Sequence, residues 1–264
     1  MTPDTASDTV LQARGLNVQY GTSSLFGRRP FHAVRDVSLQ LGRGEILAVI
    51  GESGSGKTSM LRAMAGLVPA SGSVMIEGRE MIGQSGRALR ALRGRVGLMF
   101  QDPVGSLSPR LTVRHAVTEP FRIHGVKDRD LDAECARLLR MVGLPADFAG
   151  RYPHQLSGGQ ARRVGVARAL ALDPSVILAD EPTAGLDVSV QGELLNLLRG
   201  LQDRLGISML IITHNLHVVR HIADRIAIAL DGEIVEQGDN GRILTAPEHP
   251  FTRALLAANL HVAR

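Results

Sequence analysis

Short, uninterrupted hydrophobic runs recur along the chain, and each has the length of a β-strand. The segments 45–50, 176–179 and 208–212 are almost wholly apolar, which is typical of strands buried on both faces of a parallel sheet. Further strands are expected over 11–20, 33–41, 73–77 and 96–100. A hairpin is expected over 225–236, because the Asp231-Gly232 turn separates two strand-like runs.

Helical patterns separate most of these runs, over 58–66, 160–172, 190–205 and 216–223. Between about residues 102 and 156 the strand pattern stops. Within that stretch, the segment 128–142 carries leucines at helical spacing, with acidic residues near its start and arginines near its end, an order that suits the helix dipole. We therefore predict an α/β fold with a parallel-sheet core, antiparallel strands at the N-terminus and an inserted group of helices.

Composition agrees with a globular protein of one large or two small domains. The 264 residues are 44% hydrophobic and 21% charged, so the chain can bury a core. None of the apolar runs approaches the roughly 20 residues of a membrane-spanning helix, and the first eight residues are too polar for a secretory signal. A cytosolic location is expected, and the single cysteine, Cys135, excludes an intramolecular disulfide.

The chain is basic, with a formal net charge of +4 and a pI near 9.9. Aromatic residues make up only 3% of it and tryptophan is absent, so side chains that could stack on bases are scarce. We expect no nucleic-acid partner and interpret the arginine clusters as a solvated or nucleotide-facing surface. The clustered arginines are Arg87, Arg90, Arg93, Arg95, Arg162, Arg163 and Arg168.

A glycine-rich loop, 51–58, lies between the expected strand at 45–50 and the following helix. This is the context in which such a loop binds phosphate, because its backbone N–H groups and the helix N-terminus converge on an anion. Lys57 would reach the β- and γ-phosphates, and the hydroxyl of Thr58 would bind Mg²⁺. The expected nucleotide-binding residues here are Gly51, Ser53, Gly54, Ser55, Gly56, Lys57, Thr58 and Ser59.

Two carboxylates, Asp180 and Glu181, end the apolar strand at 176–179. Asp180 would hold the magnesium ion and Glu181 would activate the attacking water. Gln101 ends another expected strand, at the start of the helical insertion. From the residues alone, Gln101 is best interpreted as an ordinary loop glutamine.

The segment 156–160, Leu-Ser-Gly-Gly-Gln, precedes an expected helix. Ser157, Gly158, Gly159 and Gln160 can present a hydroxyl and backbone N–H groups at the helix N-terminus, which is again an anion site. One chain thus carries two phosphate-binding surfaces, which a monomer does not explain.

Together these motifs, over about residues 10–260, resemble the ATP-binding cassette (ABC) ATPases. The resemblance implies a P-loop, RecA-like core over 10–100 and 161–240, a helical subdomain over 101–160 and a C-terminal tail over 241–264. It implies that two subunits dock head to tail, so that Ser157 of one caps the ATP held by the other.

The resemblance also gives roles to single residues. Gln101 would sense the metal and the γ-phosphate, and His214, which follows the strand at 208–212, would contact the γ-phosphate. Asp187 would be the fixed acid of the loop that touches the partner subunit. Tyr20 would stack on adenine, although Phe26 or Phe31 could take its place and Tyr20 could be a core residue.

Within the family, four segments resemble the peptide and nickel importers: 101–110, 151–154, 186–191 and 249–256. That resemblance implies a motor subunit on the cytoplasmic face of the inner membrane, peripheral to two permease subunits, with an external solute-binding protein acting indirectly. The expected cargo is a peptide or a related small solute such as nickel or an opine. The resemblance favours pairing with a second, different ATPase, while the complete motif set leaves a homodimer open.

The chain departs from the importer pattern in three places. It ends without a cysteine-rich tail, so no iron–sulfur cluster is expected. Ala161 stands where a longer, often basic, residue is usual, and Gly185 replaces the commoner alanine. A second class stays open, an accessory ATPase of a soluble enzyme complex such as carbon–phosphorus lyase. The surface around 101–114 distinguishes the two, because in transporters it receives a helix of the permease.

Overall fold

The computed structural model describes residues 8–21, 31–102 and 105–260, and the chain divides into two compact units. The first combines residues 1–85 with 208–264, and the second spans 86–207. The subdomain boundaries expected from the motifs are a different division of the chain and stay a prediction.

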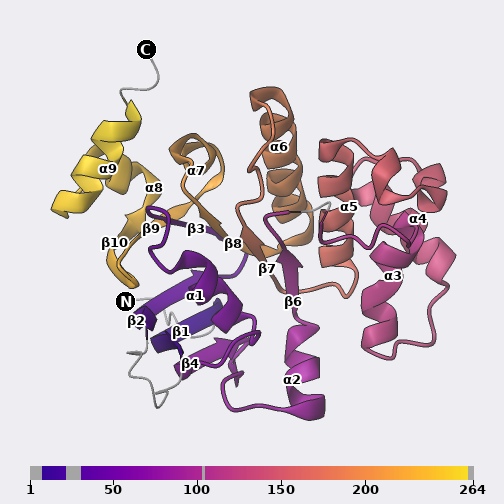
Figure 1. Cartoon of the computed structure of the whole chain (residues 1–264), viewed down its shortest axis with the longest axis horizontal. Coiled ribbons are helices and arrows are strands. Elements are labelled where there is room, and N and C mark those ends of the chain that lie inside the picture. The colour runs from indigo at the N-terminus through magenta and orange to yellow at the C-terminus, as the bar shows by residue number, and fades with distance from the viewer. Residues whose placement is uncertain (1–7, 22–30, 103–104, 261–264) are drawn as a thin grey trace. The chain divides into compact units, whose positions relative to one another are not determined.

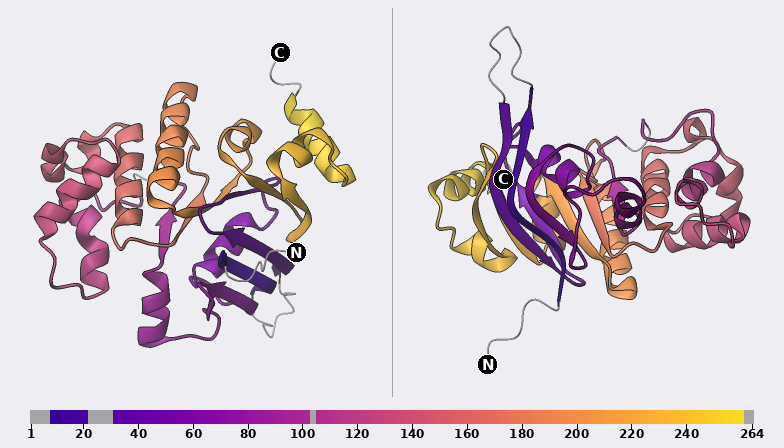
Figure 2. Two further views of the ribbon diagram at one scale, coloured as in Figure 1. Left: turned by 180° about the vertical axis from the view of Figure 1, so that it is seen from behind. Right: turned by 90° about the horizontal axis from the view of Figure 1, so that it is seen from below.

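The first unit contains an antiparallel sheet of four strands in the order β2-β1-β4-β5 (Figure 1). Its strands are β1 (Thr9–Tyr20), β2 (Phe31–Gly42), β4 (Ser71–Ile76) and β5 (Arg79–Glu80). Leu11 of β1 is opposite Leu41 on one side and Ile76 on the other, and all three side chains are fully buried. The long β1–β2 ribbon is clearest in the right-hand view of Figure 2.

A second set of strands in this unit carries the phosphate loop. β3 (Ile46–Ile50) pairs in parallel with both β8 (Ser208–Thr213) and β9 (Arg225–Leu230), and β10 (Glu233–Asp239) runs antiparallel to β9. Every residue of β3 and β8 is buried, which explains their unbroken apolar sequences. α1 (Lys57–Met64) follows β3 and α7 (Leu216–Ile222) follows β8. The carboxyl ends of β3 and β8 therefore lie at one edge.

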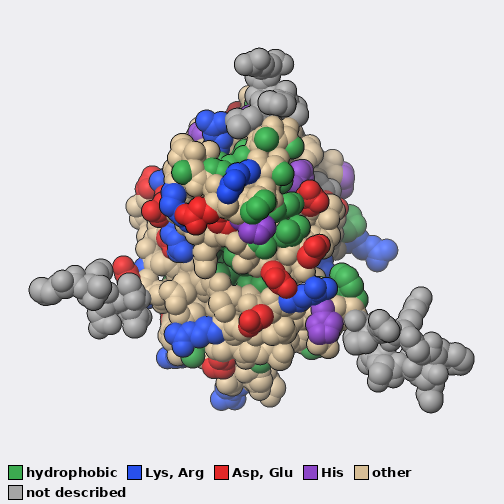
Figure 3. All heavy atoms as spheres, turned by 90° about the vertical axis from the view of Figure 1, so that its left-hand side faces the viewer, with side chains coloured by type: hydrophobic (Ala, Val, Ile, Leu, Met, Phe, Trp, Pro, Cys, Tyr) green, Lys and Arg blue, Asp and Glu red, His purple; other side chains and the backbone are tan. Residues whose placement is uncertain are grey.

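The segment expected as a tail forms two helices, α8 (Asn240–Thr245) and α9 (Pro250–Leu260). Ile243 and Leu256 enter a buried cluster that includes Ile50 of β3 and Ile228 of β9. On the outer face that contains α9, charged side chains of both signs surround a small group of hydrophobic ones (Figure 3). The C-terminal helices thus contribute to the core that packs against β3, the strand that precedes the phosphate loop.

In the second unit, β6 (Val96–Met99) pairs in parallel with β7 (Val176–Asp180). α2 (Gly86–Arg93) precedes β6 and exposes Arg87, Arg90 and Arg93, as expected of a solvated basic surface. Since Met99 is opposite Ala179, the segments after both strands start at the same edge. Gln101 and Glu181 stand in those segments.

Helices make up the rest of this unit, and α3, α4 and α5 pack against one another (Figure 2). They are α3 (Val113–Ile123), α4 (Leu131–Met141), α5 (Gly158–Leu170) and α6 (Val188–Leu205), with two short 3₁₀ turns at Ala146–Gly150 and Pro153–Gln155. Cys135 is buried on α4, and burial raises the pKa of its thiol, so it behaves as a packing residue. Across the described part of the chain, no helix combines the length and apolarity needed to cross a membrane.

Candidate nucleotide site and signature surface

The phosphate loop takes a shape that only glycine permits at two positions. A β-carbon on Gly51 would lie 2.2 Å from the carbonyl oxygen of Ala229, and one on Gly56 would lie 2.1 Å from that of Ala33. Gly56 also has a φ of +89°, in the left-handed region that side chains disfavour. The sequence therefore uses glycine where the loop passes close to neighbouring backbone.

Lys57 lies at the centre of this loop and exposes only 8% of its surface. Its ammonium group donates to the carbonyl oxygens of Gly51 and Glu52, at 2.8 and 2.7 Å, and to the hydroxyl of Ser55 at 3.2 Å. The loop thus wraps around a cation at the N-terminus of α1. This arrangement attracts anions, because the helix dipole and the ammonium charge add.

The other expected residues of this unit lie around the loop. Ser53 and Gly54 are exposed, while Thr58 and Ser59 are half-buried on the first turn of α1. The Tyr20 hydroxyl donates to Ser59 Oγ at 3.2 Å, and Tyr20 is 38% exposed, so it is not a core residue. Phe31 is 62% exposed, and Phe26 lies outside the described residues.

His214 follows β8, and the register of β8 against β3 fixes where it starts. Thr213 is opposite Ile50, so His214 and Gly51 are the next residues at the same edge. His214 is exposed. The pairing therefore brings the start of the phosphate loop and the expected γ-phosphate contact to one side of the first unit.

The acidic pair belongs to the second unit. Asp180 ends β7 and is 6% exposed, and Glu181 follows with a φ of +46°. A left-handed conformation in a residue other than glycine costs about 1–2 kcal/mol, so the surrounding contacts must hold Glu181 in place. Gln101 is exposed just beyond β6, at the same edge as the acidic pair.

The signature segment forms a capping box at the start of α5. Ser157 Oγ accepts from the backbone N–H of Gln160 at 3.2 Å, and Gln160 Oε1 accepts from the backbone N–H of Ser157 at 3.0 Å. The Ser157 hydroxyl proton is left to donate outward, next to the first-turn N–H groups of Gly158 and Gly159, which have no acceptor within the helix. Ser157 and Gly158 are exposed.

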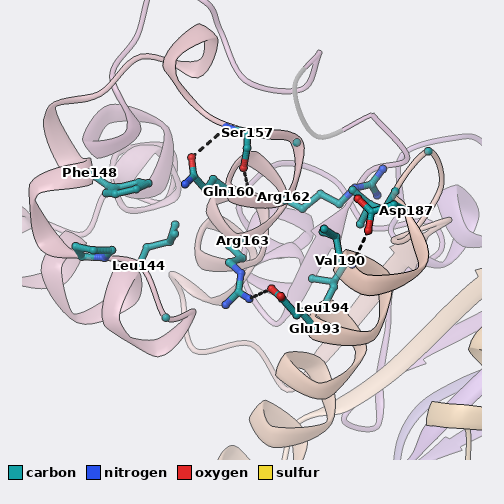
Figure 4. Close-up of a pocket in the computed structure, with 16 residues that line it drawn as sticks. Leu144, Phe148, Ser157, Gln160, Arg162, Arg163, Asp187, Val190, Glu193 and Leu194 are labelled. Atoms are coloured by element: carbon teal, nitrogen blue, oxygen red, sulfur yellow. Dashed lines mark hydrogen bonds and ion pairs between the residues drawn. The ribbon is translucent and has the colours of Figure 1, made fainter.

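A cavity of about 700 Å³ opens beside this segment (Figure 4). Its walls include the signature residues, the loop 185–187, and Arg163 and Glu193, which form an ion pair at 3.0 Å. Apolar side chains from α6 and from the segment 144–148 line the rest. Asp187 borders the cavity and caps α6, because its carboxylate accepts from the Val190 N–H at 2.9 Å. The signature surface is therefore concave and open, with both polar and apolar walls.

One residue of this region differs from what its sequence context predicts. Arg162 was expected on a solvated or nucleotide-facing surface, but it is only 7% exposed and donates to the carbonyl oxygens of Pro182 and Ala184. That expectation was wrong for Arg162, because a buried arginine has no signature in a single sequence. Its neighbour Ala161, the departure noted after the signature, is fully buried as well.

The proposed residues thus fall into two sets, one in each unit. Tyr20, the loop 51–59 and His214 belong to the first, and Gln101, the pair Asp180 and Glu181, the signature and Asp187 belong to the second.

Comparison with known proteins gives the family. Residues 34–184 match the model of the ABC transporter family, and the chain belongs to that family. The glutathione import ATP-binding protein GsiA of Salmonella paratyphi A is 45% identical over 256 residues, which are 95% of the chain and 41% of the relative. The chain thus spans less than half the length of that relative. A putative peptide import ATP-binding protein of Brucella ovis is 43% identical over 94% of the chain and 78% of its own length.

Solved structures confirm the predicted fold class. The dimeric ATP-binding cassette MJ0796, in a post-hydrolysis state with ADP and Pi, is 30% identical with a TM-score of 0.77, over 87% of the chain and 98% of its own. CbiO1 of Clostridium perfringens, part of the ABC transporter complex cbiONQ, is 27% identical with a TM-score of 0.78, over 97% of both chains. The fold is that of the ABC ATPase cassettes, with an antiparallel sheet, a parallel core and grouped helices.

Proposed function

We propose that the chain is the ATP-hydrolysing motor subunit of an importer. The observation that supports the proposal is that one chain carries two features of the kind that binds anions. The first is the glycine loop around Lys57, and the second is the exposed helix start at Ser157. In the proposed head-to-tail arrangement, each ATP would lie between the loop of one cassette and the signature of the other.

ATP binding begins at the phosphate loop. Lys57 would exchange its contacts with Gly51 and Glu52 for phosphate oxygens, and the close approach of backbone at Gly51 and Gly56 leaves N–H groups to line the phosphates. Tyr20, exposed and tied to Ser59, is placed to cover the adenine ring.

A magnesium ion fits the donor types available. The hydroxyl of Thr58, the carboxylate of Asp180 and the side-chain carbonyl of Gln101 are hard oxygen donors, which Mg²⁺ prefers together with phosphate oxygens. Asp180 ends a buried strand and is itself 6% exposed, so its orientation is fixed. Bound magnesium would neutralise charge on the phosphates.

Hydrolysis would rest on Glu181, which accepts a proton from the attacking water. Lys57 and His214 would stabilise the charge that develops on the transferring phosphoryl group, and Gln101 would orient the water and the metal contacts. Preorganisation is the main contribution expected of these residues, because phosphoryl transfer requires positioning and electrostatic stabilisation above all.

Closure of two cassettes would provide the mechanical step. Ser157, Gly158 and Gly159 of one subunit, with Gln160 holding the cap, would bind the γ-phosphate held by the other, and Asp187 would face the partner's loop. Because these contacts exist only in the closed dimer, ATP favours closure and hydrolysis releases it. That cycle would drive two permease subunits.

The import names of the two relatives support uptake of a peptide-like solute as the cargo. They also favour transport over the accessory-ATPase alternative. The proposed assembly is therefore peripheral, on the cytoplasmic face of the membrane, with two permeases, an external solute-binding protein and a second cassette that is related to this chain.

The test uses Glu181→Gln, which should bind ATP and turn it over slowly, so that the closed complex persists. The variant is purified with ATP from detergent-solubilised membranes of the native cell, and its partners are identified by mass spectrometry. Two polytopic membrane proteins and a second cassette ATPase are expected. Lys57→Ala, treated identically, should lose the ATP-dependent part of this set. Recovery of soluble enzyme subunits without a permease would overturn the importer proposal.

A further inference from the structure

Arg162 has an unusual environment for an arginine. In the part of the chain that the structure describes, it is the only arginine among the buried residues. It stands five positions after Ser157 on α5, and its two terminal nitrogens donate to different carbonyl oxygens, those of Pro182 and Ala184. Figure 4 shows the side chain reaching from α5 toward the loop that contains Asp187. The planar fork of a guanidinium reaches the two oxygens with separate nitrogens, whereas a lysine at this position would have to reach both from a single nitrogen.

The segment that Arg162 holds is the loop between Glu181 and Asp187. Glu181 has a φ of +46° and Gly185 a φ of +72°, so two of five consecutive residues adopt a left-handed conformation. Internal support comes from two long turn bonds, Ala184 N–H to Glu181 O at 3.1 Å and Leu186 N–H to Thr183 O at 3.3 Å. Because the Glu181 conformation is strained, contacts from outside the loop are needed to keep it. Arg162 makes two of them.

The same helix also contacts the segment after Gln101. Arg168, one and two-thirds turns further along α5, donates to the carbonyl oxygen of Ser106 at 2.8 Å and to its hydroxyl at 3.0 Å. Burial lowers the pKa of the Arg162 guanidinium from its ordinary value, and the charge of Asp102 opposes that shift. Asp102 directly follows Gln101 and accepts from the Gly105 N–H at 2.8 Å. The signature helix is therefore linked to both segments that carry proposed catalytic groups.

We propose that Arg162 is a positioning residue that fixes the Glu181–Asp187 loop to the signature helix and so sets the orientation of Glu181. This inference rests on the proposed role of Glu181 in hydrolysis. A movement of α5, when Ser157 meets a nucleotide, is passed to the loop through two hydrogen bonds from one guanidinium. Removing the guanidinium releases the loop while the phosphate loop, in the other unit, keeps its own contacts.

The experiment compares Arg162→Met and Arg162→Lys with wild type and with Arg204→Met. Arg204 is a matched control, because it also donates to two carbonyl oxygens, those of Gly200 and Met141, but it is exposed and distant in sequence from every motif. Amide hydrogen exchange of the 181–187 peptide is measured in the purified chain, together with ATP affinity and the kinetics of hydrolysis.

Arg162→Met should raise the rate of amide hydrogen exchange at residues 184 and 186 by about tenfold or more, since the free energy of local opening falls. It should lower kcat by ~10- to 100-fold, the scale expected when a catalytic group is misplaced by about 1 Å, and leave ATP affinity within about twofold. Arg162→Lys should be intermediate in both measurements, because it keeps the charge but not the fork.

The proposal is overturned if Arg162→Met matches Arg204→Met in both exchange and kcat. It is also overturned if ATP affinity and kcat fall together with the unfolding midpoint, which is what a purely structural residue would produce. If Arg162→Met does not fold, the comparison of Arg162→Lys with wild type decides. If the wild-type chain hydrolyses no ATP, the proposed function fails, and loop exchange alone still decides the role of Arg162.

Discussion

The ammonium group of Lys57 has two tasks in this chain. It donates to the carbonyl oxygens of Gly51 and Glu52, so it holds the two ends of the phosphate loop together without a bound phosphate. It is also the cation that the loop surrounds, and its 8% exposure means that another side chain cannot easily replace it. The loss of Lys57 therefore affects both the shape and the charge of the loop.

Lys57→Ala should abolish ATP turnover and weaken nucleotide binding by at least about tenfold, because a hydrogen bond to a charged group contributes roughly 1.5–3 kcal/mol. Nucleotide binding is measured by fluorescence of a labelled ATP analogue, and turnover by phosphate release. Arg62→Ala, an exposed site on the same helix, is the control and should behave as wild type. Full activity in Lys57→Ala would refute the assignment of the phosphate site.

The two glycines of the signature differ in their surroundings. A β-carbon on Gly159 would lie 2.9 Å from Val190 Cγ1 on α6, whereas one on Gly158 would lie 4.0 Å from Leu186 Cδ2. Valine is stiff at χ1 within a helix, so it cannot easily move aside. Gly159 is therefore required by packing between α5 and α6.

Gly159→Ala should destabilise the protein by about 1–3 kcal/mol, the usual cost of overpacking, while Gly158→Ala should be close to neutral. Urea unfolding of both variants gives the difference. Adding Val190→Ala to Gly159→Ala should recover most of the loss, with a coupling energy above ~0.5 kcal/mol in a double-mutant cycle. Strict additivity would mean that Val190 is not the obstacle.

The elements that could be predicted best are those whose residues are all buried. β3 and β8 are buried on every residue, and their sequences are unbroken apolar runs, so both could be predicted from the sequence. α8 and α9 could not, because each buries only part of a face, through Ile243 and Leu256. Arg162 escaped prediction for a related reason. Its burial depends on carbonyl oxygens about twenty residues away, and no local pattern records that contact.

The attachment of α9 depends on one carboxylate of β10. Glu236 is 8% exposed and accepts from the N–H groups of Glu248 and His249, at 2.9 and 3.0 Å. Burial by itself would raise the pKa of Glu236, but the neighbouring Thr252 hydroxyl and the hydrogen bonds from these two N–H groups bring it below the ordinary 4.5. When folding lowers the pKa of a carboxylate, the carboxylate stabilises the protein. This contribution is complete at pH values above the pKa that the group has in the unfolded chain. That contribution is lost as the pH falls from 4.5 through the folded pKa.

Glu236→Gln should therefore lower stability at pH 7 by about 1–3 kcal/mol, because an amide satisfies the two N–H groups less well than a carboxylate. The difference from wild type should shrink as the pH falls below 4.5. Urea midpoints at a series of pH values measure it, and Glu233→Gln, an exposed site on the same strand, is the control. A difference that stays constant with pH would show that the Glu236 charge does not secure α9.

The chain carries both the phosphate loop and the signature, so in the proposed head-to-tail pair each ATP site would need one loop and one signature from different copies. Lys57→Ala removes the loop of a copy and leaves its signature. Ser157→Arg blocks the signature of a copy and leaves its loop. A mixed pair of these two variants then has one site with both parts intact and one site with neither.

Each variant alone should be inactive, and an equimolar mixture should regain about a quarter of wild-type ATPase activity, because half of the randomly formed pairs are mixed and each has one of two sites intact. Phosphate release is measured over a range of mixing ratios, after thermal unfolding has shown that Ser157→Arg, which loses a helix cap, is still folded. The regained activity should follow the product of the two mole fractions, since only mixed pairs contribute. Recovery would mean that the complete motif set is sufficient for two copies of this chain to form an active site. A mixture as inactive as its components would mean that the opposing signature has to come from a different cassette. The same two variants could then each be paired with that cassette to establish which subunit supplies the loop and which the signature of each site.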